Sequence, residues 1–236
     1  MTCFDYSIDP LLTANIQNAV IRGVAEILEE TREGIFIYDP NDRLYVLYAP
    51  AELGKEWLKK HEERGYVLMI LYDDELITFA AERYGLAVDE KCRQVVWTRK
   101  DKPEQGTKLV LRQADDSDLA RIRGIYNKSS DADILGALRQ GTILLGYVEG
   151  VLVGMIGMHM EGSMGMLEVL PEYRRRGYGT ELEKALIIRQ LELGCIPYGH
   201  VYLSNAASFA LQKSIGMECS EGTLTWLFPK DEEENT

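Results

Sequence analysis

The sequence has little cysteine: four residues in a chain of 236, which are Cys3, Cys92, Cys195 and Cys219. No two of them form a C-x-x-C pair, the spacing typical of zinc sites. Their wide separation also argues against a disulfide framework. We therefore expect reduced thiols and no metal site.

Long apolar runs and a basic leader are also lacking. The first ten residues carry Asp5 and Asp9 and have neither the basic start nor the apolar core of a secretory signal peptide. No apolar run reaches the roughly 20 residues that a transmembrane helix needs. The sequence therefore predicts a cytoplasmic protein with no membrane partner.

The chain has few basic residues: it contains 26 Lys and Arg but 38 Asp and Glu, which gives a net charge of −12. An acidic protein does not attract the phosphates of nucleic acids or of anionic lipids. We therefore expect no nucleic-acid partner. A negative surface favours a cationic amine, either a small molecule or a peptide, as the substrate.

The length of 236 residues, with 46% hydrophobic and 27% charged residues, predicts a globular chain of two domains. Residues 1–100 are expected to form an α/β domain without a phosphate-binding motif. Apolar side chains at helical spacing predict a helical segment over residues 10–30. Strands are predicted at 35–38, 44–48, 66–71 and 94–98, and helices at 51–64 and 74–84.

A polar stretch, residues 101–107, is the expected linker to a second α/β domain at 108–229. This domain is predicted to have strands at 109–111, 142–148, 151–158, 164–170, 200–203 and 223–228. Its predicted helices are 115–127, 134–139, 180–193 and 206–215. Residues 230–236 form an acidic tail that we expect to be disordered.

Three consecutive arginines precede the helix predicted at 180–193, in the segment PEYRRRGYGT that covers residues 171–180. The positive end of a helix dipole repels cations, so this cluster becomes favourable only when an anion binds. Gly177 and Gly179 allow the backbone to approach such an anion. The segment predicts a phosphate cradle, and the alternative is a solvated basic turn.

The P-loop ending Gly-Lys-Ser/Thr is absent, and Leu182 stands where the dinucleotide fingerprint needs a third glycine. Residues 167–179 (LEVLPEYRRRGYG) instead resemble the acyl-CoA-binding motif of the GNAT superfamily of N-acyltransferases. Residues 111–119 (LRQADDSDL) resemble its opening strand and helix. Residues 199–208 (GHVYLSNAAS) and 211–217 (LQKSIGM) resemble its closing motif, most closely in the glycine N-acyltransferase-like branch.

The resemblance implies a mixed-sheet GNAT fold for the C-terminal half and transfer of an acetyl or other short acyl group from coenzyme A to a primary amine. In the glycine N-acyltransferase-like branch a degenerate GNAT-like copy often precedes the active domain, and residues 1–100 fit that place. The resemblance also implies the residues that hold acetyl-CoA: Leu167, Val169, Arg174, Arg175, Arg176, Gly177, Tyr178, Gly179, Thr180, Asn205 and Ser208.

Direct attack by an amine calls for a general base or a water relay. Glu161 and Glu168 are the candidates, because Ser163 occupies the position of the base in the branch. Gln212 stands where many family members have a tyrosine acid, and Tyr202 and Tyr178 are candidate substitutes. Asp131 and Asp133 precede a predicted helix and are expected either to attract a cationic acceptor or only to cap that helix.

Two other functions stay open. The chain can be a noncatalytic acyl-CoA-binding or regulatory protein, which the residues Ser163 and Gln212 favour. Residues 1–100 can instead act as a dimerisation scaffold in a homodimer.

Overall fold

The computed structural model describes residues 2–230, so the disorder expected for residues 231–236 lies outside the described part. The chain divides into two compact units. The first unit comprises Met1–Gln94, Val201–Ala206 and Cys219–Thr236, and the second comprises Val95–His200 and Ala207–Glu218. The expected linker at 101–107 falls inside the second unit. Residues 223–228, expected in the C-terminal domain, fall inside the first.

A six-stranded sheet forms the first unit, in the order β1-β2-β3-β4-β13-β5. Neighbouring strands are antiparallel except β3 and β4, which are parallel. The strands are β1 (Glu26–Glu30), β2 (Ile35–Asp39), β3 (Leu44–Tyr48), β4 (Leu68–Leu71), β5 (Leu86–Val88) and β13 (Thr225–Pro229). The last strand of the chain therefore pairs between two strands of its first half.

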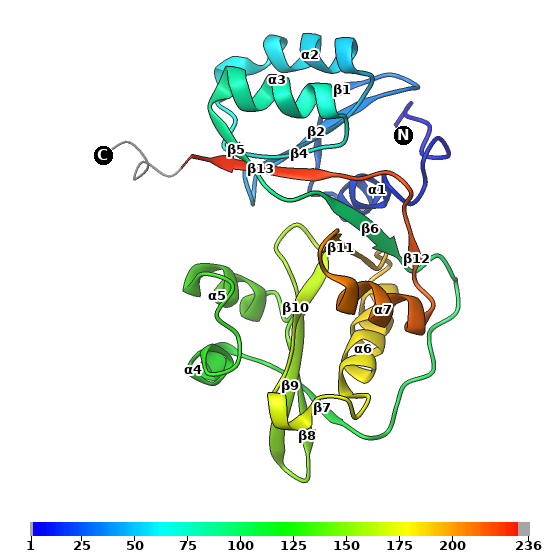
Figure 1. Ribbon diagram of the computed structural model, residues 1–236, viewed down its shortest axis with the longest axis vertical. Coiled ribbons are helices and arrows are strands. Elements are labelled where there is room, and N and C mark those ends of the chain that lie inside the picture. Colours follow the sequence, from blue (N-terminus) through cyan, green and yellow to red (C-terminus); the bar gives the residue numbers. More distant parts are fainter. Residues whose placement is uncertain (1, 231–236) are drawn as a thin grey trace. The chain divides into compact units, whose positions relative to one another are not determined.

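Helices cover both faces of this sheet. Phe36 packs with Trp57 of α2 (Ala51–Lys60) and with Leu76 of α3 (Asp74–Tyr84), and Figure 1 shows both helices on one side. Ile35 belongs to a second cluster with Ile16 of α1 (Ala14–Ile21). Because successive side chains of a strand point to opposite faces, each of these faces has its own core. A short 3₁₀ helix, η1 (Glu62–Arg64), follows α2.

The helical segment predicted for residues 10–30 is correct only for residues 14–21. Helix α1 ends at Ile21, and Gly23 has a positive φ of 69°. Residues 26–30 then pair with β2 as the edge strand β1. The apolar residues at helical spacing did not reveal this change, because a short apolar run suits a strand equally well.

A four-stranded antiparallel sheet is the centre of the second unit, in the order β10-β9-β8-β7. The strands are β7 (Val110–Gln113), β8 (Leu144–Val148), β9 (Val151–Met158) and β10 (Met164–Val169). Helices α4 (Leu119–Arg123) and α5 (Asp131–Arg139) lie on one side of the sheet and α6 (Tyr178–Glu192) on the other (Figure 1). The mixed α/β fold class predicted from the sequence is confirmed.

The helix predicted over residues 115–127 is much shorter. A 3₁₀ turn, η2 (Asp116–Asp118), comes first, and α4 ends at Arg123. Asp115 and Asp118 form a capping box that starts this turn. A second 3₁₀ turn, η3 (Pro171–Tyr173), follows β10 and leads into α6.

Both halves of the chain repeat one order of elements. The order β2, β3, α2, β4, α3, β5 matches β9, β10, α6, β11 (Tyr198–Tyr202), α7 (Ala206–Ile215), β12 (Glu218–Cys219). β13 lies between β4 and β5, and β6 (Cys92–Val96) lies between β11 and β12 in a three-stranded sheet. In each case the inserted strand comes from the other half of the sequence.

Candidate active site

The arginine turn between β10 and α6 has an unusual backbone. Arg175 has a φ of 63° and Gly177 a φ of 86°, both in the left-handed region. The first amide of α6 to find a backbone acceptor is that of Glu181, which donates to Gly177 at 3.2 Å. The amides of residues 175–180 donate to no oxygen within the described residues. Successive N–H groups in such a turn form a concave nest for an anion.

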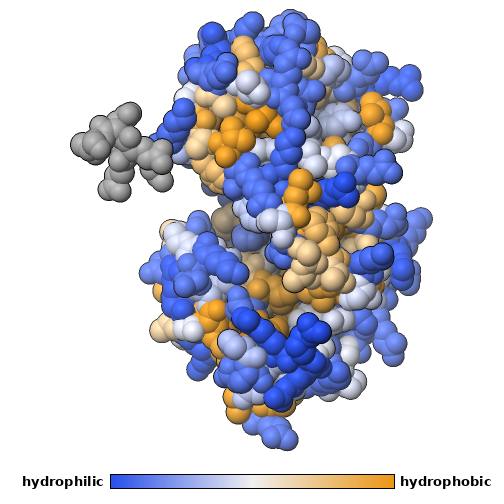
Figure 2. Space-filling model, in the orientation of Figure 1, coloured by the Kyte–Doolittle hydropathy of each residue, from blue (hydrophilic) through white to orange (hydrophobic). Residues whose placement is uncertain are grey.

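The three arginines of the turn have three different roles. Arg174 is engaged, because its Nε donates to the Val169 carbonyl at 2.8 Å and one of its amino groups pairs with Glu168 at 2.8 Å. Arg176 donates to the Glu172 carbonyl at 3.0 Å. Arg175 makes no side-chain hydrogen bond or ion pair with the described residues. The face in Figure 2 is strongly hydrophilic where Figure 1 places this turn.

A fourth cation, Lys108, reaches the turn from the start of β7. Its Nζ donates to the Arg176 carbonyl at 3.0 Å. The buried carboxylate of Glu181, in the first turn of α6, accepts the backbone N–H groups of Lys108 and Leu109 at 3.0 and 3.2 Å. Sequence analysis missed Lys108, since it lies 66 positions before Arg174 and only the folded chain brings the two together.

Gly179 leaves room beside the turn. A Cβ atom built there would meet only ordinary contacts, at 3.9–4.0 Å from Leu167, Val169 and Leu211. The packing of the protein itself therefore does not require glycine at this position. The glycine and its apolar neighbours fit the close approach of a ligand that has an anionic end and an apolar arm.

Strand β10 is an edge of its sheet, so one side of its backbone has no neighbouring strand in that sheet. Its register with β9 shifts between Gly165 and Glu168, and Met166 has a φ of 52°. Such a bulge interrupts the ladder of hydrogen bonds and leaves a backbone group unpaired. Leu167 lies in this bulge, and Val169, beyond it, pairs again with Gly154.

Glu168, one of the two candidate bases, lies between two cations. One carboxylate oxygen pairs with Arg174 at 2.8 Å and the other with Lys128 at 3.6 Å. Its side chain is 20% exposed. Both oxygens are therefore engaged, and the residue connects the arginine turn with the loop between α4 and α5.

Glu161, the other candidate base, lies in the turn between β9 and β10. The hydroxyl of the buried Ser163 donates to its Oε1. Tyr198 donates to the Glu161 carbonyl and Gln190 to the Gly162 carbonyl, both at 3.0 Å. The last two bonds fix the backbone of the turn. The carboxylate of Glu161 contacts a hydroxyl group, whereas that of Glu168 contacts two cations.

A second buried carboxyl group lies on α6. Glu183 accepts a hydrogen bond of 2.8 Å from Nε2 of Gln212 on α7, and the two side chains are 4% and 7% exposed. Burial raises the pKa of Glu183 to about 7, against a smaller lowering by the Gln212 bond. Sequence analysis did not single out Glu183, because a glutamate in an amphipathic helix usually faces solvent.

The two aspartates expected near an acceptor are both engaged in their own loop. Asp133 forms a capping box with Ser130 at the start of α5. Asp131 pairs with Arg123 of α4. Capping, one of the two roles expected for this pair, is therefore present for Asp133.

The remaining expected site residues are divided between the units. Tyr178, Gly179, Thr180 and Ser208 belong to the second unit, and Tyr202 and Asn205 belong to the first. The Tyr202 hydroxyl donates to Asp89 at 2.7 Å, and burial together with this carboxylate raises the pKa of Tyr202. A raised pKa makes Tyr202 a weaker acid, so it is a poor substitute for the family tyrosine.

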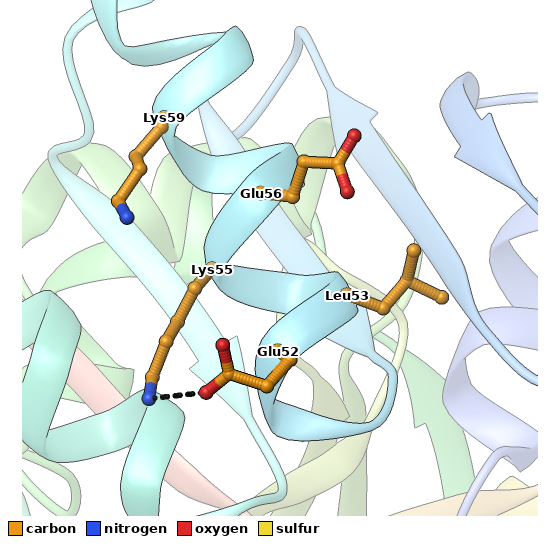
Figure 3. A pocket seen from close by; sticks show the side chains of 5 residues that line it. All are labelled: Glu52, Leu53, Lys55, Glu56 and Lys59. Carbon is orange, nitrogen blue, oxygen red and sulfur yellow. Dashed lines mark hydrogen bonds and ion pairs between the residues drawn. The ribbon is translucent and has the colours of Figure 1, made fainter.

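An open hollow of about 530 Å³ lies on the first unit along α2. Figure 3 shows that residues of both charges line it, with Lys55 turned toward Glu52 at 3.0 Å. Lys55 also pairs with Glu75. A helix start that carries Glu52 repels anions. This hollow therefore lacks the chemistry of the arginine turn.

The described residues contain no group of three or more His, Cys, Asp or Glu side chains placed to hold a metal ion. None of the helices in residues 2–230 is long and apolar enough to cross a membrane.

The bulged edge strand, the N–H-lined turn and helix α6 occur together in the second unit, whose fold is similar to that of solved GNAT proteins. Residues 111–217 match the family model described as the acetyltransferase (GNAT) family. This match supports acyl transfer from coenzyme A as the general activity of that part of the chain. A search of curated proteins finds no match.

Solved structures support the fold. A protein of Drosophila matches with a TM-score of 0.65 and 19% identity, over 85% of this chain and 76% of that one. A putative GNAT-family acetyltransferase from Novosphingobium aromaticivorans matches with a TM-score of 0.57 and 17% identity, over 96% and 100%. A GCN5-related N-acetyltransferase from Kribbella flavida matches with a TM-score of 0.58 and 13% identity, over 94% and 95%. The Novosphingobium match includes both units.

Proposed function

We propose that this protein is an N-acyltransferase that moves an acetyl or other short acyl group from coenzyme A to a primary amine by direct attack. The observation that carries the proposal is the arginine turn. Its amides from residue 175 to residue 180 have no acceptor within the described residues, and Arg175, Arg176 and Lys108 surround them with positive charge. A pyrophosphate supplies the missing acceptors and the opposite charge.

The acyl-pantetheine arm is proposed to lie along the open edge of β10. Its amides can pair with backbone groups there as an added strand does. A backbone N–H freed by the bulge at Met166 and Leu167 is suited to hold the thioester oxygen as negative charge develops on it. The apolar side chains around Gly179 fit the arm between these two points.

The reaction removes one proton from the amine nitrogen and releases coenzyme A as a thiolate. The amine nitrogen attacks the thioester carbonyl, the base accepts the proton of the amine, the C–S bond breaks, and the thiolate leaves. A free thiol has a pKa of about 8.5, so the thiolate leaves with little help near neutral pH. This explains how Gln212 can replace an acidic tyrosine without loss of the reaction.

Glu161 is our proposed base. Its Oε1 accepts from the Ser163 hydroxyl, a contact that orients the carboxylate. Glu168 is the second candidate. Arg174 and Lys128 engage both of its oxygens, so it is better placed to brace the turn than to accept a proton.

The acceptor is proposed to be a cationic small molecule or a peptide amine. Asp131 and Asp133 place negative charge in the loop before α5, and the whole chain carries a net charge of −12. Lys128, in the same loop, pairs with Glu168, and Asp131 pairs with Arg123 of α4, so the negative charge that no described cation pairs in this loop is that of Asp133.

The first half is proposed to be a degenerate copy of the acyltransferase domain, as in the glycine N-acyltransferase-like branch. The repeated order of elements supports this origin. In the copy, α2 takes the place of α6, and it starts with Pro50, Ala51 and Glu52 instead of arginines and glycines. We therefore expect one molecule of coenzyme A per chain.

The alternative function is noncatalytic acyl-CoA binding. Thermal unfolding with coenzyme A and a thiol-release assay with acetyl-CoA across a panel of amines separate the two. A ligand at a hundred times its dissociation constant should stabilise the fold by about 2.7 kcal/mol. Stabilisation without thiol release from any amine would favour the alternative. Absence of stabilisation by both coenzyme A and acetyl-CoA would overturn both.

A further inference from the structure

The contact between Glu183 and Gln212 is a buried polar pair that the proposed reaction does not use. Glu183 lies on α6 and Gln212 on α7, and 29 positions separate them in the chain. One hydrogen bond of 2.8 Å, from Nε2 of Gln212 to Oε1 of Glu183, connects them. The pair therefore joins two helices through polar atoms that are shielded from solvent.

Each residue of the pair has one side-chain oxygen without a hydrogen-bond partner among the described residues. Oε2 of Glu183 and Oε1 of Gln212 are buried, and neither has a hydrogen-bond partner among the described residues. Both atoms are acceptors if the carboxyl group is ionised, so an ionised Glu183 leaves two buried acceptors unsatisfied. Leaving such atoms unpaired is costly in a protein interior.

A single proton on Oε2 of Glu183 gives both of these unpaired oxygens a hydrogen bond. The neutral acid then donates from Oε2 to Oε1 of Gln212 while it still accepts from Nε2. An acid and an amide joined in this way form a closed ring of two hydrogen bonds. Both oxygens of Glu183 and both polar atoms of the Gln212 amide are then used.

We propose that Glu183 is a neutral carboxylic acid in the folded protein, that it closes this ring with Gln212, and that the ring is a pH-sensitive latch that fastens α7 to α6. Loss of the proton turns one hydrogen bond of the ring into a contact between two acceptors. The latch then opens and α7 loosens from α6. The proposal does not depend on the acyltransferase function.

The surroundings agree with a neutral group. Burial is the main influence on the pKa of Glu183, which rises to about 7, and the bond from Gln212 is the only opposing one. The titratable or charged groups on the segments packed against α6 are Tyr147 of β8, Glu168 of β10, Lys213 of α7, Arg112 of β7 and Lys108 just before β7. None of these groups, and none of the charged neighbours on α6 itself, acts on Glu183.

The direction of the pH effect follows from proton uptake. The unfolded chain ionises Glu183 near its ordinary pKa of 4.5, and the folded chain keeps the proton up to about 7. Between these values folding takes up one proton, so the stabilising contribution falls as pH rises. Above about 7 both states are ionised, and no further loss from this group is expected.

The direct test is a ¹³C NMR titration of the Glu183 carboxyl carbon in the wild-type protein, which needs no variant to fold. We expect a midpoint near 7. A midpoint near 4.5, the ordinary value, would overturn the proposal.

The variant test compares Glu183→Gln with the wild type. The substituted amide forms the same ring with Gln212 at every pH, because it donates and accepts without a titrating proton. The ratio of wild-type to variant folding constants should therefore fall by up to about tenfold per pH unit below pH 7 and then level off. Amides of α7 should exchange faster in the wild type than in the variant at pH 8.

The control is Glu192→Gln, which removes an exposed charge at the other end of α6 and should show a flat ratio. A flat ratio for Glu183→Gln, or the same slope in the control, would contradict the latch.

Discussion

Arg174 braces Val169: its Nε donates to the Val169 carbonyl oxygen at 2.8 Å and so ties the arginine turn back to the end of β10. The same guanidinium pairs with Glu168. The arginine that best matches the family motif is thus a structural clamp in this structure. Arg175, the next residue, makes no side-chain hydrogen bond or ion pair with the described residues. In this turn Arg174 therefore supports the backbone, and Arg175 supplies a positive charge that no described residue pairs.

This division predicts different effects for the two arginines. Arg175→Ala should weaken coenzyme A binding roughly 10- to 100-fold, the value of one charge-assisted hydrogen bond, with little change in thermal stability. Arg174→Ala should weaken binding and also lower stability by about 1 kcal/mol, because Glu168 loses a partner. Calorimetry and thermal unfolding measure the two quantities. Arg139→Ala, an exposed arginine on α5, is the control. Equal effects of both variants on stability would contradict the clamp.

The buried Asp118 predicts a loss of stability in acid. Arg112 donates to both of its carboxylate oxygens at 2.7 and 2.9 Å, and these bonds hold the pKa of Asp118 below its usual value of 3.8. A lowered pKa means that the stabilisation is complete above pH 3.8 and is lost as pH falls through the folded pKa. Asp118→Asn should therefore cost about 1–3 kcal/mol at about pH 7, and less in acid below the ordinary pKa. Urea unfolding at both pH values measures the difference. A cost that does not depend on pH would show that the charge is not involved.

The proposed base predicts a pH-dependent loss of rate. Glu161→Gln should slow the reaction roughly 10²–10⁴-fold at neutral pH, and activity should partly return at high pH, where the amine is already neutral. Coenzyme A affinity should not change. Glu149→Gln, an exposed acid in the β8–β9 turn, is the control. A near-wild-type rate for Glu161→Gln together with a large loss for Glu168→Gln would transfer the role to Glu168.

The acidic loop predicts the preference for the acceptor. Asp131→Asn removes a charge and keeps the start of α5, because the capping box uses Ser130 and Asp133. We expect a higher KM for cationic amines and no change in KM for neutral ones. Steady-state kinetics with a matched pair of amines checks this. A preference of the wild type for anionic acceptors would refute the proposal directly.

The pairing of β13 with β4 and β5 predicts that the stability of the first unit depends on β13. Leu227 of β13 is fully buried and packs in the core with Leu76 and Trp57. Leu227→Ala should cost about 2–5 kcal/mol. Hydrogen exchange should speed up first in β4 and β5, the neighbours of β13. Phe228→Ala, an exposed neighbour on the same strand, should cost much less. Faster exchange confined to β8 and β9 would be the contrary result.

Local signals predicted the elements with clear ends. The helix predicted at Asp74–Tyr84 agrees with α3 at both ends, because Asp73 caps its start and Gly85 ends it in a left-handed conformation. The strand predicted at Val151–Met158 agrees with β9. Such signals lie within a few residues of each element, so one sequence is enough to find them.

Other features depend on residues that are distant in the sequence. The pattern of residues 223–228 indicated a strand but not the sheet that it joins. The same limit explains why Lys108 was missed and why the contacts of Arg174 with Val169 and Glu168 were not predicted, since these contacts depend on the folded backbone. Glu183 shows a further limit, because a helical pattern does not tell whether a second helix covers the polar face.

The position of β13 also constrains how the protein is made. Synthesis proceeds from the N-terminus, and β4 and β5 leave the ribosome long before residues 225–229 exist. Until then the edges of both strands are open, and unpaired edges invite association with other chains. The sheet of the first unit therefore stays incomplete until residues 225–229 have been translated. We expect a stop codon shortly before β13 to destabilise β4 and β5, its neighbours in the sheet, most.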